Sequence, residues 1–432
     1  MKDEARGFAA NAVLMFLALR AGDAVSLAAG MWFVPRYVSP EEIGAVLPVS
    51  SFATFVSLPV FALAMAVMRE SAVLTARGER GRVKSLLAGV FVAVAVAMAV
   101  VVAVAAFAVP RYLALMRVSE ASVGFLVVVA AFLGCVAPVY TDALQSLKKF
   151  RSLAVVEVGG AFVRFATMLA VMPFRALAGY FAGQAALPAF RMAGSVVALR
   201  GSLAVRPEPY WTRESTRRLA LSFLAILAYA SAPMAAALVE QTILRTHLPS
   251  MDSAGYYMAS RFSDFLSYLT FPLLLVLFPY TAVAAERKGS TRPFVGKCCA
   301  ATLVGAAVMA AVYAVCGGRL LALMPHGGDY AEYARYMPWL VAVTVMTSCQ
   351  VFFTNAEVSA GRFGFLWWLV PLHIIYPIAL TLAAKRGLVA NLGTLLAWFA
   401  AASAARFLFC LFSFLRREPL ASAYMRSSAP CR

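Results

Sequence analysis

Residues 86–109 read Leu-Leu-Ala-Gly-Val-Phe-Val-Ala-Val-Ala-Val-Ala-Met-Ala-Val-Val-Val-Ala-Val-Ala-Ala-Phe-Ala-Val, without one charged side chain. A helix of about 20 apolar residues matches the thickness of the hydrocarbon core of a bilayer. Charged residues flank the run, with Lys84 before it and Arg111 after it. This stretch therefore predicts a helix that spans a membrane.

The composition extends this prediction to the whole chain. Of its 432 residues, 62% are hydrophobic and 13% are charged, whereas soluble proteins have roughly 45–50% and about 25%. The mean hydropathy is +0.81. Lipid must therefore be the main solvent, which excludes a soluble domain. The net charge of +18 fits loops that face anionic lipid better than it fits nucleic-acid binding.

The seven cysteines show no CxxC and no paired spacing. They are typical of small core residues and indicate neither a disulfide framework nor a zinc site. We expect no metal and no cofactor.

Apolar runs between charged clusters predict an all-α polytopic membrane protein with about twelve transmembrane helices. The first run is interrupted by Arg20 and Asp23 and lacks a small-residue cleavage site, so it is interpreted as a retained span and not as a signal peptide. The predicted spans are 8–33, 44–68, 86–109, 122–140, 153–172, 177–199, 219–243, 256–281, 298–317, 334–355, 363–383 and 390–414.

The positive charge is distributed unevenly between the two sides of these spans. Most of the 38 Lys and Arg residues fall in the two ends of the chain and in the even-numbered connections. Because Lys and Arg are enriched in cytoplasmic loops, both termini are predicted to be cytoplasmic, in a multi-pass protein of the bacterial cytoplasmic (inner) membrane.

The longest inner connection, RGSLAVRPEPYWTRESTRR (200–218), divides the chain near its middle. It predicts an N-terminal six-helix lobe over 1–200, a cytoplasmic linker over 201–218 and a C-terminal six-helix lobe over 219–432. Three short blocks recur at corresponding connections: Arg111–Met116 with Arg319–Met324, Thr141–Phe150 with Thr354–Phe363, and Ser39–Gly44 with Met251–Gly255. Six spans per lobe make the repeats parallel.

Several of these blocks also carry a family resemblance. Arg36-Tyr-Val-Ser-Pro-Glu-Glu-Ile-Gly44, Gln145–Leu153, Glu240–Leu244 and Asp252–Tyr257 resemble motifs of the O-antigen type oligosaccharide-lipid flippases of the multidrug/oligosaccharidyl-lipid/polysaccharide (MOP) exporter superfamily. Where that family often has Asp late in span seven, this chain has Glu240 or Gln241. The resemblance implies two six-helix lobes around a central cavity that move polyprenyl-diphosphate-linked glycans by alternating access.

Charged residues inside spans are costly, so they are expected to face a partner or a wet cavity. Arg20, Arg164, Arg191 and Arg261 are the candidate cavity residues, because the planar guanidinium donates paired hydrogen bonds to phosphate. Candidate pairing or coupling carboxylates are Asp23, Glu157, Glu240 and Asp264. The R-x-x-D spacing of Arg20 with Asp23 and of Arg261 with Asp264 places each pair on one helix face.

Two interpretations of these charges stay open. The arginines line a phosphate-binding cavity, or they form salt bridges that only hold the bundle together. A combination of the two is exchange: resting Arg–Asp pairs open, the arginines pass to a diphosphate, and the released carboxylate takes H⁺ or Na⁺.

Three functions compete at this stage. A flippase is favoured for polyprenyl-diphosphate-linked oligosaccharide, such as an O-antigen or another polysaccharide repeat unit. An ion-coupled multidrug or small-solute antiporter is the alternative. A membrane glycan polymerase or ligase comes third, because no large outer loop is available for catalysis. No catalytic motif is present in the sequence, so the chain is not expected to be an enzyme.

Overall fold

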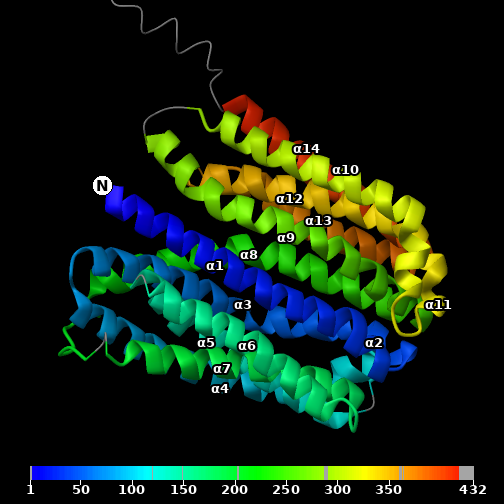
Figure 1. Ribbon diagram of the computed structural model, residues 1–432, viewed down its shortest axis with the longest axis horizontal. Helices are drawn as coiled ribbons and strands as arrows, with labels where there is room; N and C mark the ends of the chain where they lie inside the picture. Colours follow the sequence, from blue (N-terminus) through cyan, green and yellow to red (C-terminus); the bar gives the residue numbers. More distant parts are fainter. Residues whose placement is uncertain are drawn as a thin grey trace, which may run out of the picture. The chain divides into compact units, whose positions relative to one another are not determined.

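The computed structural model describes residues 2–118, 120–147, 149–201, 204–286, 290–359, 362 and 364–417 (Figure 1). Within these ranges the chain forms helices and no strand, which confirms the all-α class. Each predicted span overlaps one long helix. These are α1 (Lys2–Ala28), α3 (Pro40–Ala76), α4 (Arg80–Leu115), α5 (Ala121–Ser146), α6 (Phe150–Val171), α7 (Ala176–Leu199), α8 (Arg213–His247), α9 (Ser250–Glu286), α10 (Arg292–Ala322), α12 (Met337–Ser359), α13 (Leu366–Lys385) and α14 (Leu392–Arg417).

Shorter helical segments join or extend the long ones. A π-helical turn, Ala29–Phe33, and α2 (Val34–Tyr37) continue α1. The wide turn lies just before Pro35, whose missing N–H interrupts regular hydrogen bonding. Between α10 and α12 lie α11 (Gly327–Tyr330) and a 3₁₀ segment, Ala331–Tyr336.

The helix surfaces are those of a membrane protein. Nine helices within the described ranges are long and apolar enough to cross a bilayer. Large apolar side chains stand on the outside of the helices, including Phe107 of α4 and Phe125 of α5 at 71% exposure and Trp367 of α13 at 82%. Surface of this kind suits lipid and not water.

Exposed tryptophans lie close to helix ends. They are Trp32 near the end of α1, Trp211 before α8, Trp339 at the start of α12, and Trp367 and Trp368 at the start of α13. The indole ring is both apolar and a hydrogen-bond donor, so it favours the boundary between lipid and water. We therefore expect these tryptophans to lie near the membrane boundary.

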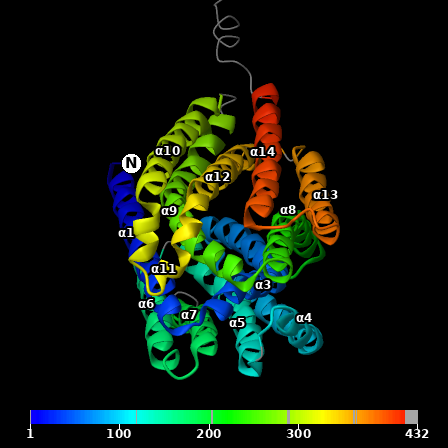
Figure 2. The ribbon, with the colours of Figure 1, turned by 90° about the vertical axis from the view of Figure 1, so that its right-hand side faces the viewer.

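Contacts group the chain into two compact units, Met1–Ala254 and Gly255–Arg432. In the first unit α5 packs against α7, α6 against α7 and α1 against α6, while α3 packs against α4, α5 and α8. In the second unit α12 packs against α10 and α14, and α13 packs against α14 (Figure 2). The division into lobes 1–200 and 219–432 around a cavity stays a prediction, and residues 418–432 lie outside the described ranges.

The Ser-Pro-Glu-Glu stretch at residues 39–42 is a helix start. The Ser39 hydroxyl accepts a hydrogen bond from the Glu42 backbone N–H at 3.3 Å and donates to the Glu42 carboxylate at 3.1 Å. Pro40 occupies the first helical position of α3, where its missing N–H is not needed. Ser39 therefore caps the start of α3, and the three-residue spacing also lets its hydroxyl hold the Glu42 carboxylate.

The repeated blocks lie at corresponding helix ends. Arg111–Met116 closes α4 and Arg319–Met324 closes α10, and the two methionines at their ends are buried. Gly44 near the start of α3 and Gly255 near the start of α9 each meet a neighbour from the same unit. A Cβ on Gly44 would lie 2.7 Å from Ser253 Cβ, and one on Gly255 would lie 2.4 Å from the Tyr333 ring.

The connection before α8 is docked onto the ends of α3 and α4. Lys84 donates to the Val205 carbonyl at 2.9 Å, the Glu208 backbone N–H donates to the Gly81 carbonyl at 3.2 Å, and Trp211 Nε1 donates to the Ser85 carbonyl at 3.1 Å. A capping box of Thr212 and Ser215 then starts α8. We call residues 204–212 the docked linker.

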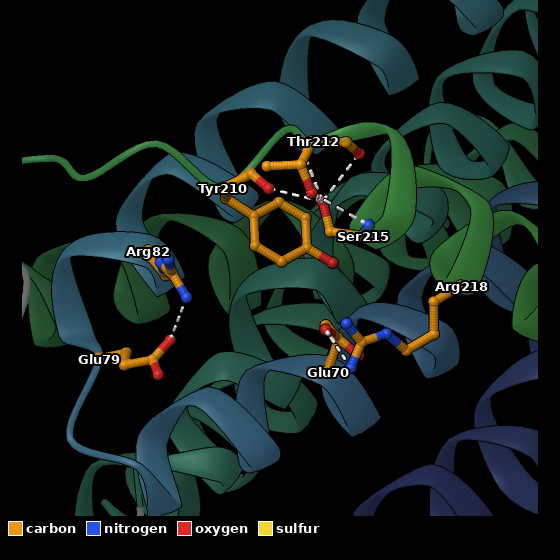
Figure 3. A network of polar contacts seen from close by, with 7 residues as sticks. All are labelled: Glu70, Glu79, Arg82, Tyr210, Thr212, Ser215 and Arg218. Carbon is orange, nitrogen blue, oxygen red and sulfur yellow. Dashed lines mark hydrogen bonds and ion pairs between the residues drawn. The ribbon is translucent and has the colours of Figure 1, made fainter.

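Glu70, Tyr210 and Arg218 complete this attachment, and Figure 3 shows them together with the cap of α8. The Glu70 carboxylate on α3 lies 3.9 Å from Arg218 Nη1 on α8. Burial, together with the nearby Glu70 carboxylate, raises the pKa of the Tyr210 phenol. Tyr210 is therefore a neutral, packed anchor at physiological pH.

We predict that Gly89→Ala releases the docked linker, because a Cβ there would lie 2.3 Å from Trp211 Nε1. Limited chymotrypsin digestion should cleave after Tyr210 or Trp211 several-fold faster than in the wild type. Gly134→Ala on α5 is the control, since nothing lies within 4 Å of its added Cβ. Equal cleavage rates in all three proteins would contradict the docking.

Candidate functional site: charged side chains within the helices

Three helices of the first unit hold the charged side chains predicted for spans one, five and six. On α1, Arg20 Nη1 lies 3.1 Å from Asp23 Oδ2. Glu157 of α6 and Arg191 of α7 form an ion pair between helices. Arg164 of α6 reaches back to α1, where its Nη1 lies 3.4 Å from Ser26 Oγ. We call Arg20, Asp23, Glu157, Arg164 and Arg191 the N-terminal charge cluster.

Small residues let α6 and α7 approach closely enough to form the pair between them. A Cβ on Gly160 would lie 3.3 Å from Arg191 Cγ, and one on Gly183 would lie 3.0 Å from the Arg164 carbonyl oxygen. Close approach at small residues is a general way to pack helices in membranes. These glycines therefore belong to the architecture of the cluster.

Positive charge exceeds negative charge in the cluster, with three guanidinium groups for two carboxylates. Arg191 acts electrostatically on Asp23 as well as on Glu157. Arg164 forms no ion pair with any residue that the structure describes, and its Nε is buried without a hydrogen-bond partner there. One guanidinium thus retains unused donors beside α1.

The second unit contains a separate pair on α9. Arg261 Nη1 lies 3.1 Å from Asp264 Oδ2, and the guanidinium carbon lies 4.7 Å from the centre of the Tyr257 ring. The ring holds the cation in place by a cation–π contact. Asp264 is 39% exposed at its side chain, so the pair is not sealed within the protein.

The other predicted residues have different surroundings. Glu240 lies half-buried on α8, a helix that packs against α3. Gln184, which shares a helix face with Arg191 in the sequence, donates to the Tyr180 hydroxyl at 2.7 Å. Arg406 of α14 donates to the Ala402 carbonyl and lies over the Tyr376 ring. No cluster of metal ligands occurs in the described ranges.

Sequence reasoning missed two neighbours of the arginines. Ser26, the partner of Arg164, stands three residues after Asp23, and Tyr257 stands four residues before Arg261. Both spacings place the residue on the same helix face as the charge. The spacing was therefore an available signal for each of them.

Solved structures that resemble this chain include transporters. An inward-facing multidrug resistance MATE family transporter of the MOP superfamily aligns with a TM-score of 0.70 and 12% identity, over 97% of this chain and 100% of that chain. The chain has the MOP transporter fold. The inward closed conformation of the lipid II flippase MurJ aligns with a TM-score of 0.67 and 10% identity, over 95% of this chain and 88% of that one.

A third structure with the MOP fold bears on how this fold varies in function. It is a MOP superfamily transporter from Pyrococcus furiosus, described as having a binding pocket of reverse polarity that suggests a different function. It aligns with a TM-score of 0.60 and 12% identity, over 94% of this chain and 95% of that one. No family model and no curated protein matches the sequence. At these identities the likeness establishes the twelve-helix fold of a multi-pass membrane protein and leaves its substrate open.

The interhelical pair yields a stability prediction. Arg191→Ala leaves the Glu157 carboxylate, which is 15% exposed, without its partner, and breaking a buried pair in this way costs about 3–5 kcal/mol, less when solvent reaches it. We expect a clear fall in the melting temperature in detergent. Arg164→Ala, which breaks no ion pair, should change it little.

Adding Glu157→Ala to Arg191→Ala should restore part of the lost stability, because no unpaired charge then remains. A double-mutant cycle on melting temperatures measures this coupling. Purely additive losses would show that Glu157 and Arg191 do not stabilise each other.

Proposed function

We propose that this chain is a flippase that moves a polyprenyl-diphosphate-linked oligosaccharide from the inner to the outer leaflet of the bacterial cytoplasmic membrane. The observation that carries the proposal is the excess guanidinium in the N-terminal charge cluster, Arg164. It is half-buried and has donors to spare. A diphosphate provides acceptor oxygens for the donors of Arg164 and a negative charge that balances its positive charge.

Arginine suits this task better than lysine does. Its planar fork donates two parallel hydrogen bonds to one phosphate, and those bonds are strong because both partners are charged. In the proposed transporter Arg20, Arg164, Arg191 and Arg261 would hold the diphosphate. Alternating access would carry the headgroup across while the lipid tail stays in the bilayer.

The ion pairs supply a means of release. Arg20 with Asp23 and Arg261 with Asp264 are paired at rest. When a diphosphate takes the guanidinium groups, the displaced carboxylates are free to bind H⁺ or Na⁺. Reformation of the pairs then competes with the bound anion and favours its departure.

A multidrug antiporter is the second candidate, because a MATE multidrug transporter shares the fold. A binding site for cationic drugs requires carboxylates in excess, whereas the N-terminal charge cluster has guanidinium in excess. The charge balance therefore favours an anionic substrate.

Replacing the unpaired arginine tests the proposal. Arg164→Ala should weaken binding of undecaprenyl diphosphate to the purified protein by about tenfold or more, at an unchanged melting temperature. Arg164→Lys should restore part of the affinity, because lysine keeps the charge and loses the fork. Arg406→Ala on α14 is the control for loss of one positive charge within a helix.

Affinity for the diphosphate lipid that is unchanged in Arg164→Ala would refute this role. Binding of a cationic dye in preference to the diphosphate lipid would favour the antiporter instead.

Orientation is tested in a cysteine-free background. A cysteine at Glu208, in the docked linker, should react with a membrane-impermeant maleimide only after cell lysis. A cysteine at Leu388, exposed between α13 and α14, should react in intact cells. The reverse pattern would place both termini outside the cytoplasm.

A further inference from the structure

A groove with a volume of about 300 Å³ lies between α9 and α12 of the second unit. Five hydroxyl side chains line it, namely Ser267 and Thr270 of α9 and Thr344, Thr347 and Ser348 of α12. Ligand pockets in proteins begin at about this size and usually combine apolar walls with a few polar groups. Five hydroxyl groups in one groove are unusual on helices whose surfaces are largely apolar.

Three of the hydroxyls donate to their own helix. Thr270 donates to the Ser267 carbonyl at 3.2 Å, Thr344 to the Leu340 carbonyl at 2.8 Å and Thr347 to the Val343 carbonyl at 2.9 Å. A hydroxyl oxygen that donates in this way still has lone pairs to accept a hydrogen bond. The threonines are therefore acceptors fixed in orientation.

In the described ranges the two serine hydroxyls, unlike those of the threonines, do not donate to their own helix. Neither Ser267 nor Ser348 has a hydrogen-bond partner for its hydroxyl in the described part of the chain. Each can donate one hydrogen bond and accept others. Together the five groups match a ligand that presents several hydroxyls of its own.

The wall of the groove includes an aromatic ring. Phe271 of α9 lines it and is 45% exposed. One face of a pyranose ring carries C–H groups, which pack favourably on an aromatic surface, while its rim carries hydroxyls. An acyl chain would pack on the Phe271 ring but would form no hydrogen bonds with the five hydroxyl groups.

The groove continues the face of α9 that carries the Arg261–Asp264 pair. Asp264, Ser267 and Phe271 follow at spacings of three and four, so they share one side of the helix. Ser267 stands about 4.5 Å along the helix axis from Asp264. A sugar attached to a diphosphate held by Arg261 could therefore reach the groove.

We propose that the groove between α9 and α12 binds the sugar next to the diphosphate of a lipid-linked glycan, through its hydroxyls and Phe271. This inference rests on the proposed flippase function and adds a carbohydrate subsite to it. Arginines hold the diphosphate, and the groove distinguishes a glycosylated lipid from the bare carrier.

The test compares two kinds of probe on the full-length protein in nanodiscs. The probes are undecaprenyl diphosphate alone and the same lipid carrying N-acetylglucosamine or galactose. The triple variant Ser267→Ala, Thr344→Val, Ser348→Ala should bind at least one glycosylated lipid about tenfold more weakly than wild type does, since several hydrogen bonds are lost. Its affinity for the bare diphosphate should stay within about twofold.

Thr381→Val on α13 is the matched control. Its hydroxyl also donates to its own helix, at 2.7 Å to the Pro377 carbonyl, and it lies outside the groove. Phe271→Leu should lower affinity for the glycosylated lipid alone. Melting temperatures check that each variant is folded.

The possible failures are distinguishable. If wild type binds bare and glycosylated lipids equally well, or the triple variant weakens both or neither, the sugar groove is overturned while the flippase proposal stands. If wild type binds no diphosphate lipid at all, the proposed function fails and the sugar groove fails with it.

Discussion

In the hydrocarbon core of a membrane there is no water to hydrogen-bond a backbone amide, and each unsatisfied group costs several kcal/mol. The helices that the structure describes satisfy most of these groups within themselves, except where an internal proline such as Pro138 in α5 removes one N–H donor. The same scarcity of water acts on side chains. Charged side chains such as Arg20 and Glu157 lie in the spans beside opposite charges. A charged group in a span without such a partner is energetically costly, so it indicates a functional role.

Sequence patterns determine most of the helical layout. The predicted spans 153–172 and 177–199 nearly coincide with α6 and α7, because each apolar run ends at a charged or turn-forming residue. The prediction for α3 is less complete. Its span 44–68 is shorter than the helix Pro40–Ala76, since helical turns continue into the polar region beyond the apolar run.

The contacts of the candidate site are likewise only partly predictable from the sequence. Arg20 with Asp23 and Arg261 with Asp264 are predictable, because partners three residues apart on one helix need no tertiary information. The pair of Glu157 with Arg191 is not, since it depends on how closely α6 and α7 approach. Glycines at 160 and 183 were visible in the sequence, but which neighbouring atoms they admit is known only from the fold.

The fold of the chain does not determine its substrate, whereas the charge of the candidate site bears on it. A multidrug transporter and the lipid II flippase MurJ align with this chain at similar TM-scores, so shared architecture leaves the substrate undetermined. The excess of guanidinium groups in the N-terminal charge cluster is the basis on which we propose an anionic substrate. The hydroxyl-lined groove between α9 and α12 is the basis of the proposed sugar subsite.

The docked linker has a mechanical consequence. A flexible connection between two helices would let each helix move independently of the other. Residues 204–212 have no such slack, because their backbone and Trp211 are held at several points by α4 and their last residue caps α8. A displacement of the N-terminal end of α8 therefore also displaces the ends of α3 and α4.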